Sequence, residues 1–258
     1  MSVEFLSKED SSHIFEEEWY ECSSEDHFWF DWRFEVFLKH AIRAGFDPEK
    51  EYRFLDIGSG AGILKFQIEK RTAWIVDCVD LNVSALQQIS GGRGKVLYYN
   101  IYDQKEEWKE FYDGVLVFDV IEHLERPKLF LKASLFHLKR SGFTFVNVPA
   151  LPSMYSMYDE KMGHLRRYTT HSLQEACTDD YHISPCCCSY WGFFLLPILS
   201  VRTLLFKLGK KGNVVKDGFS PPNQLVNNLL KIIGRWEARW LLCPLLGTSV
   251  IFIGKKCE

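Results

Sequence analysis

The sequence predicts an α/β fold in which a mostly parallel β-sheet is covered by helices on both faces. Three observations support this class. Five apolar runs with strand character alternate with helical stretches over about residues 51–150. The first run leads into a glycine-rich turn, and the first two runs each end on an aspartate. This alternation is typical of βαβ units, whose crossover helices cover both faces of a parallel sheet.

The expected elements follow one another along the chain. Residues 3–45 read as helices that carry many aromatic side chains, as in HFWFDWRFEVFLKHAI. The core strands are expected in YRFLDI, AWIVDCVD, KVLYYN, GVLVFDV and GFTFVNVP. Helices are expected between them, at about 63–70, in NVSALQQI and in PKLFLKASLFHLK. After Pro149 the alternation stops, and residues 150–170 read as a polar loop.

The C-terminal part resumes the core and then departs from it. A helix is expected from about residue 172 and a strand near 182–190, before a mostly helical stretch and the final strand TSVIFIGKK. We therefore divide the chain into four segments. They are an N-terminal helical segment over the site (1–50), the core (51–190), a helical cap insertion (191–246) and a closing edge strand (247–258).

Composition narrows the functional classes. The chain has 258 residues, a formal net charge of -3 and 47% hydrophobic residues, which fits a globular protein and argues against a nucleic-acid surface. The start, MSVEFLSKED, lacks the pattern of a signal peptide. The apolar stretch YWGFFLLPILSVRTLLF is interrupted by Pro197 and Arg202, so no transmembrane helix is predicted. The eight cysteines show no CxxC spacing, which favours reduced thiols in a cytoplasmic protein.

The strongest motif is FLDIGSGAGIL. A strand ends at Asp56, and Gly58, Gly60 and Gly62 allow a tight turn into a helix, where main-chain N–H groups can meet a nucleotide-like ligand. The dinucleotide fingerprint needs glycine or alanine at its sixth position, and Ile63 stands there. A tight strand–helix turn without any ligand is the alternative.

The second motif is the aspartate of CVDLN. Asp80 ends the next strand, where a carboxylate can accept hydrogen bonds from both hydroxyls of a ribose. The alternative is that Asp80 caps the following helix. Because nicotinamide enzymes use an acid in the same way, Asp80 favours a nucleoside ligand without choosing the cofactor.

Further segments resemble one family. With the two motifs above, YDGVLVFDVIEHLERP, KRSGFTFVNVP and MYDEKMGHLRRYT resemble the class I S-adenosylmethionine-dependent methyltransferases. Within them, the chain is similar to a bacterial-type small-molecule or lipid-linked group with a GH-x-RRY segment, and more distantly to ubiquinone-pathway O-methyltransferases. HFWFDWR and WEARWLLCPLLGTSVIFIGKK extend the similarity over the whole chain. The resemblance implies a Rossmann-like seven-stranded sheet, order 3-2-1-4-5-7-6, whose last strand is antiparallel.

The resemblance also implies which residues hold S-adenosylmethionine. Asp80 would take the ribose, and Leu81 would flank the adenine. Arg33 would pair with the methionyl carboxylate, or else form a surface ion pair. The full set of implied cofactor residues is Arg33, Asp56, Gly58, Ser59, Gly60, Gly62, Asp80, Leu81, Asn100, Ile101 and Phe118.

One position departs from the family pattern. Asn100 stands where the family often has an aspartate that accepts from the adenine amine. Its amide oxygen can still accept that bond, although without charge assistance. Asp103 is the alternative acceptor.

Candidate catalytic residues follow the fourth and fifth strands. His123 and His164 are expected at carboxyl ends of strands, where either could accept a proton near neutral pH, and Glu122 stands beside His123. We expect His123 to matter more, although packing would also explain it. Asp119, Glu122 and His123 resemble a Mg²⁺ ligand set in some ubiquinone-pathway relatives, but metal-free relatives share the triplet, so no metal is assigned.

The acceptor is expected to contact the loop after the fifth strand. Arg166, Arg167 and Tyr168 are the predicted acceptor-binding residues, and paired guanidiniums suit an anionic group. A solvated basic turn is the alternative reading. The segment 191–216 could lie on the inner face of a membrane as a peripheral contact, or simply form the buried side of the cap.

The sequence thus predicts methyl transfer to an oxygen or nitrogen of a small-molecule or lipid- or glycan-linked acceptor. Two other classes stay open. A nicotinamide-dependent oxidoreductase is opposed by Ile63 and by the downstream motifs. A catalytically inactive cofactor-binding protein is opposed by the intact glycine turn and by Asp80.

Overall fold

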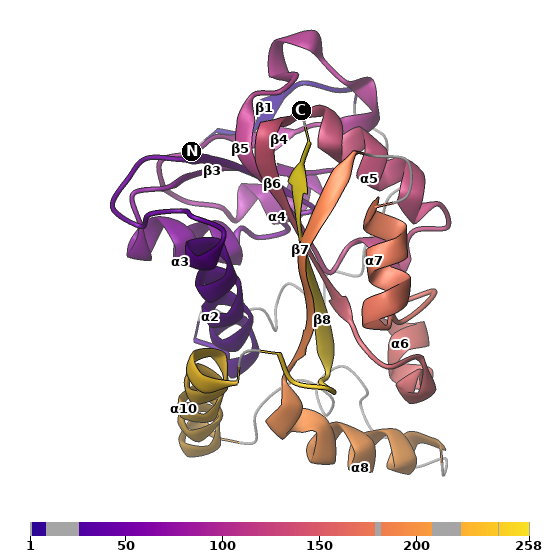
Figure 1. Cartoon of the computed structure of the whole chain (residues 1–258). Coiled ribbons are helices and arrows are strands. Elements are labelled where there is room, and N and C mark those ends of the chain that lie inside the picture. Colours follow the sequence, from indigo (N-terminus) through magenta and orange to yellow (C-terminus); the bar gives the residue numbers. More distant parts are fainter. Residues whose placement is uncertain (1, 9–25, 179–181, 208–222, 242, 258) are drawn as a thin grey trace.

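A single eight-stranded sheet forms the centre of the protein (Figure 1). The computed structural model describes residues 2–8, 26–178, 182–207, 223–241 and 243–257. The strand order is β1-β4-β3-β2-β5-β6-β8-β7. The strands are β1 (Glu4–Phe5), β2 (Arg53–Ile57), β3 (Ile75–Asp80), β4 (Val96–Tyr98), β5 (Tyr112–Phe118), β6 (Leu138–Pro149), β7 (Ile183–Trp191) and β8 (Ser249–Lys256).

Strands β2 to β8 have the predicted order 3-2-1-4-5-7-6, and β8 runs antiparallel to both of its neighbours. The expectation of a closing edge strand at 247–258 is wrong, because β8 lies between β6 and β7 and both of its edges are hydrogen-bonded. Residues 4–5 also differ from the helix expected there. They add a parallel strand beside β4, and the N–H of Leu6 donates to the carbonyl of Tyr98 at 2.9 Å.

Helices cover both faces of the sheet, as the alternation predicted. α2, α3 and α10 lie on one face, and α5 and α7 on the other (Figure 1). Of the residues that the structure describes, the α-helices are α2 (Phe28–Arg43), α3 (Ile63–Arg71), α4 (Val83–Gln87), α5 (Pro127–Phe136), α6 (Met157–Lys161), α7 (Thr170–Thr178), α8 (Leu196–Lys207) and α10 (Gln224–Trp240). The 3-10 helices are η1 (Ile101–Asp103), η2 (Glu106–Trp108), η3 (Ile121–His123), η4 (Pro152–Met154) and η5 (Phe193–Leu195).

The segment 150–170 is more ordered than the polar loop predicted for it. It contains η4 and α6, and α6 begins with a capping box formed by Ser156 and Asp159. The Asp159 side chain accepts from the N–H of Ser156 at 2.9 Å. Ser-x-x-Asp is a recognisable helix-start signal, and it was present in the sequence.

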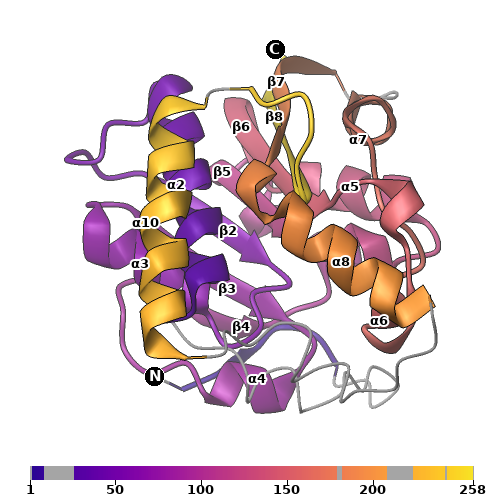
Figure 2. The ribbon, with the colours of Figure 1, turned by 90° about the horizontal axis from the view of Figure 1, so that it is seen from below.

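The insertion 191–246 contributes two described helices near the carboxyl ends of the parallel strands. Seen from below, α8 crosses the molecule beneath those ends, while α10 lies along α2 (Figure 2). Trp191 itself is the last residue of β7 and therefore belongs to the core. Residues 208–216 of the predicted membrane-contact segment, and 9–25 of the N-terminal one, lie outside the described residues. Among the described helices, none has the length and apolar character to cross a membrane.

The inner side of α10 docks on α2 through polar and small residues. The Asn227 side chain accepts from the N–H of Phe28 at 2.9 Å and donates to the carbonyl of Asp26 at 2.7 Å. Gly234 lies against the ring of Trp32, and a Cβ atom there would come within 2.5 Å of the ring. The contact leaves no room for a side chain at this position.

We predict that Gly234→Ala lowers the free energy of unfolding by about 1–3 kcal/mol, because the added methyl group must displace a fully buried indole. Helix propensity alone would make the alanine variant more stable by about 1 kcal/mol. A loss of stability would therefore come from the contact with Trp32. Urea unfolding measures it. Asn228→Ala, on the exposed side of the same helix, is the control, and stabilisation by Gly234→Ala would contradict this packing.

Candidate active site

The glycine-rich turn connects β2 to α3 at the carboxyl edge of the sheet. Gly58, Gly60 and Gly62 all have left-handed φ angles, of 76°, 54° and 73°. A Cβ atom at Gly58 would come within 2.4 Å of the Val120 side chain, which follows β5. Glycine is therefore required at this position by both backbone conformation and space.

Asp80 ties this turn to the end of β3. One carboxylate oxygen accepts from the N–H of Gly60 and the other from the N–H of Asn82, each at 2.8 Å. Asn82, and not Asp80, is the N-cap of α4, since its side chain accepts from the N–H of Ala85 at 3.0 Å. Each Asp80 oxygen retains acceptor capacity after one such bond. The structure thus disfavours the capping alternative and leaves Asp80 able to accept from a ligand.

Asp56 lies at the base of the turn as a buried carboxyl group, with 3% of its surface exposed. Burial raises its pKa to about 7; the nearby Arg33 guanidinium opposes this shift, and the carboxylate of Asp80 adds to it. A group with a pKa near neutrality at the centre of the turn makes this region sensitive to pH.

Arg33 belongs to a line of polar contacts that runs through the site. Its Nη1 donates to Asp119 Oδ2 at 2.5 Å, and the other oxygen of Asp119 accepts from Asn147 Nδ2 at 2.8 Å. The amide oxygen of Asn147 in turn accepts from Trp191 Nε1 at 2.8 Å. Asp119 has a φ of 57°, an unusual conformation for a non-glycine residue directly after β5.

These contacts rule out the expected alternative of a surface ion pair, because the Arg33 side chain is 10% exposed. The guanidinium also lies over the ring of Phe118, with 5.6 Å between Cζ and the ring centroid. Arg33 and Phe118 therefore stand together at the end of β5. Binding of a methionyl carboxylate by Arg33 remains a prediction.

The remaining predicted cofactor residues follow β3 and β4. Leu81 is half-buried beside α4, and Ile101 is buried in the core. Asn100 caps η1, where its side-chain oxygen accepts from the N–H of Tyr102 at 3.1 Å. The alternative acceptor, Asp103, takes a hydrogen bond from Ser7 Oγ at 2.5 Å.

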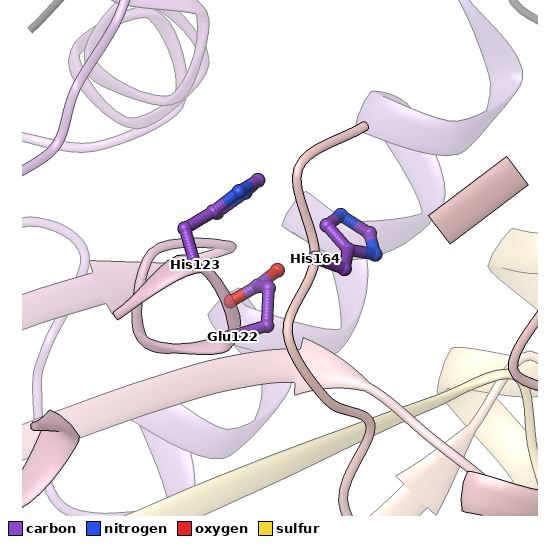
Figure 3. A group of neighbouring side chains, drawn as sticks. All are labelled: Glu122, His123 and His164. Atoms are coloured by element: carbon purple, nitrogen blue, oxygen red, sulfur yellow. The ribbon is translucent and has the colours of Figure 1, made fainter. Parts of the chain in front are cut away.

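Three predicted catalytic side chains come together from two segments. Glu122 and His123 follow β5 in η3, and His164 lies on the loop after α6, with its side chain close to theirs (Figure 3). The two imidazole rings meet edge to face, with 4.8 Å between their centroids. The N–H of Leu165 donates to the carbonyl of Glu122 at 2.8 Å, which fixes the loop against η3.

Each histidine is oriented through its Nδ1 atom. His123 Nδ1 lies 3.2 Å from the carbonyl oxygen of Gly163, and His164 Nδ1 lies 2.9 Å from Asp159 Oδ1. A carbonyl or carboxylate oxygen can only accept, so both Nδ1 atoms carry the hydrogen. Burial, and then the neighbouring His164, lowers the pKa of His123 to about 4.

Asp159 holds the segment 156–167 together through its side-chain contacts. It is fully buried, and Arg167 Nε donates to the oxygen that also contacts His164, at 2.7 Å. The interactions with His164 and Arg167 lower the pKa of Asp159 against the opposing effect of burial. Asp159 therefore orients the His164 ring through Nδ1.

Glu122 stands in a different environment. It is fully buried, and neither carboxylate oxygen has a hydrogen-bond partner. Burial and the nearby Asp119 raise its pKa well above the usual value. One ligand atom each from Glu122, His123 and His164 lie within 4.8 Å of one another, so this set could hold a divalent ion. Asp119, expected in that set from the sequence, is instead engaged by Arg33 and Asn147.

The predicted acceptor residues have structural contacts of their own. Arg167 Nη1 donates to the carbonyl of Ala150 at 3.0 Å, in addition to its ion pair with Asp159. Tyr168 is buried in the core, and Arg166 donates to the carbonyl of Leu124 at 3.0 Å. The solvated basic turn is therefore excluded, whereas acceptor binding by these residues remains a prediction.

Two residues of the site were not predicted as functional residues. Asp159 had a signal in the sequence, namely its place in the Ser-x-x-Asp capping box. Asp119 was noted only as a possible metal ligand, and its pairing with Arg33 across 86 positions of sequence has no local signal.

We predict that Asp56→Asn changes the pH dependence of stability. The folded-state pKa of Asp56 is about 7, above the 3.8 of the free side chain, so the folded state holds its proton more tightly. The wild type should therefore lose stability relative to the variant as pH rises from about 4 to 7. Urea unfolding across this range measures the difference, and Glu125→Gln serves as a reference for the loss of an exposed carboxylate. Parallel curves for wild type and Asp56→Asn would contradict the shift.

Comparison with known proteins places this geometry in a family. Residues 29–180, more than half of the chain, match the family described as "Methyltransferase domain". No curated protein matches the chain. An Archaeoglobus fulgidus SAM-dependent methyltransferase is similar in structure, with a TM-score of 0.55 and 17% identity over 96% of this chain and 100% of that one.

Two other solved structures are also similar. A putative Haloferax volcanii methyltransferase, solved with the Trm112 activator, has a TM-score of 0.60 and 12% identity over 95% of this chain and 100% of that one. A putative sarcosine dimethylglycine methyltransferase from Galdieria sulphuraria has a TM-score of 0.58 and 12% identity over 87% and 85%. These matches agree with the observed fold. The chain belongs to the methyltransferase-domain family and has the class I fold that its sequence predicted.

Proposed function

We propose that this protein transfers a methyl group from S-adenosylmethionine to an oxygen or nitrogen of a small-molecule or lipid- or glycan-linked acceptor. The observation that carries the proposal is the hydrogen bond from the N–H of Gly60 in the glycine turn to the carboxylate of Asp80. It sets main-chain N–H groups and a carboxylate at the edge of the sheet where ligands of open α/β folds bind. Ile63, the first residue of α3, argues against a nicotinamide cofactor at this turn.

The cofactor site is formed by the ends of β2, β3 and β5. Asp80 receives the ribose hydroxyls, and the turn at Gly58 and Gly60 leaves space for the methionyl part. Arg33 faces its carboxylate with a guanidinium that Asp119 already orients. S-adenosylmethionine supplies an activated methyl group on a sulfonium, so the protein must chiefly align the acceptor and exclude water.

His164 accepts the proton of a hydroxyl acceptor. As the methyl–oxygen bond forms and the methyl–sulfur bond breaks, the O–H proton passes to the ring nitrogen opposite Nδ1. Asp159 supports this step, because it fixes the orientation and the tautomer of the ring, so that the other ring nitrogen can accept. His123, which the sequence alone favoured, has a pKa of about 4 and is therefore a weak base near neutral pH. The carboxyl oxygens of Glu122, which have no hydrogen-bond partner in the described structure, are available to a group of the acceptor.

We predict that Asp80→Ala weakens S-adenosylmethionine binding by about 1.5–3 kcal/mol, because it removes charge-assisted hydrogen bonds to the ribose. Asp80→Asn should weaken it less, since one acceptor oxygen remains. Gly60→Val should abolish binding through strain at a φ of 54°. Calorimetric titration with S-adenosylmethionine, its demethylated product and NAD measures each effect, with Glu107→Ala, at an exposed acid, as the control. Unchanged affinity in Asp80→Ala, or preferential binding of NAD, would contradict the proposal.

We predict that His164→Asn reduces the single-turnover rate by about 10²–10⁴, the usual contribution of a positioned base. His123→Asn should have a smaller effect, and the exposed His171→Asn is the control. The measurement uses a labelled methyl donor with an acceptor found by screening, over a range of pH, together with the affinity for S-adenosylmethionine. If His164→Asn keeps the wild-type rate and pH profile, His164 is not the base, and alignment alone explains catalysis.

A further inference from the structure

Helix α10 presents its apolar side to solvent. Leu225, Leu229, Ile232, Trp236 and Trp240 recur at intervals of three or four residues and are 54–81% exposed. On the opposite side, α10 buries Asn227, Gly234, Glu237 and Ala238, and Leu230 and Ile233 are partly buried against the core. A surface helix normally turns its apolar stripe toward the core. Packing within the described chain therefore gives no reason for this stripe.

Helix α8 and the preceding η5 extend the same surface. Phe193, Phe194, Ile198, Val201 and Leu204 are 41–59% exposed. η5 meets α10 through an edge-to-face contact between Phe194 and Trp236, with 5.9 Å between ring centroids. Together these ten side chains form one surface, which we name the α8–α10 apolar face.

The exposed charges on α10 itself are cationic. Glu237, the only acidic residue of α8 or α10, is buried and accepts from the N–H groups of Gly192 and Phe194. On the side toward α2, Lys231 and Arg235 form ion pairs with Asp26 and Asp31. Arg239 instead lies over the ring of Trp240, 5.4 Å from its centroid. Arg239 is therefore the cation that we expect to meet an anionic partner.

The geometry points to the surface of an anionic lipid bilayer as the partner of the α8–α10 apolar face. Apolar side chains bordered by arginine, with tryptophan at the boundary, are typical of helices that lie in the membrane interface. Each helix is shorter than a bilayer span of about 20 residues, and none of the described helices could cross a membrane.

The placement of the face adds a functional consequence. α8 crosses beneath the carboxyl ends of the parallel strands (Figure 2). The guanidinium carbon of Arg202 on α8 lies 4.3 Å from the ring centroid of Tyr158 in α6. Asp159, which orients His164, is the next residue of α6. Docking through α8 would therefore bring the candidate active site close to the lipid surface. This inference goes beyond methyl transfer, since binding to the lipid surface requires neither the methyl donor nor the methyl acceptor.

The test is co-sedimentation of the full chain with vesicles of phosphatidylcholine, with and without phosphatidylglycerol. We expect binding to be stronger with the anionic lipid and to weaken with salt. Ile232→Ser/Trp236→Ser should weaken binding by about tenfold or more, because two side chains no longer enter the interface. Arg239→Gln should weaken binding only to the anionic vesicles. Phe111→Ser is the control, because Phe111 is an exposed aromatic residue directly before β5 and lies outside the α8–α10 apolar face. This variant should bind both kinds of vesicle as the wild type does.

Unfolding transitions and S-adenosylmethionine affinity, measured on every variant, show that each one is folded. A wild type that does not sediment with either vesicle would overturn the inference, as would equal losses in Phe111→Ser and Ile232→Ser/Trp236→Ser. A concentration-dependent dimer that disappears in Ile232→Ser/Trp236→Ser, with unchanged vesicle binding, would show instead that two copies of the chain meet through this face. Because these assays contain no acceptor, their failure would leave the proposed methyl transfer standing.

Discussion

The candidate active site depends on one constraint, the parallel pairing of β2 with β3 on one side and with β5 on the other. The register places Ile57, Val79 and Val117 side by side, so the residues just after each strand meet at one edge. Asp80 then accepts from Gly60, and Val120 packs against Gly58. Three turns that are distant in sequence thereby support one another. A bulkier residue at Gly58 would disturb the end of β5 as well as its own turn.

The site retains polar groups whose interactions inside the protein are incomplete. Glu122 has two buried oxygens without hydrogen-bond partners, and Arg33 Nε is buried without one. Asp119 has a left-handed φ while it holds Arg33. Buried polar atoms without partners and strained backbone angles lower the stability of the folded state. They are common at sites where a bound ligand completes the interactions. They lie where the cofactor and acceptor are proposed to bind, whereas Asp159 is saturated and serves to orient its neighbours.

The C-terminal helices combine two requirements that usually oppose each other. α10 must dock on α2, and it does so with an asparagine and a glycine that fit only one arrangement. Leu230 and Ile233 pack inward beside them, and five other large apolar side chains are left for an external surface. The same segment thus provides both a rigid attachment and an exposed apolar stripe. An exposed apolar stripe of this kind is typical of a surface that binds a partner.

The sequence by itself determined the α/β class, because hydrophobic periodicity is a local signal. The glycine turn and the later motifs indicated the family, and the resemblance to that family implied the strand order. The sequence also offered Asp80, Glu122, His123 and His164 as candidate site residues, since they follow strands or stand in short motifs. Its errors arose where pairing is non-local: β8 was expected at an edge, and residues 4–5 in a helix.

Only the tertiary structure decided how these residues are arranged. The contact of Asp159 with His164 shifts the expected base from His123 to His164, and that contact depends on the path of the loop after α6. The ion pair between Arg33 and Asp119 joins a helix to a distant strand end. The outward direction of the α10 stripe depends on which side of the helix meets α2. Periodicity shows that a helix has an apolar side, but the packing of the whole chain determines whether that side faces the core or the solvent.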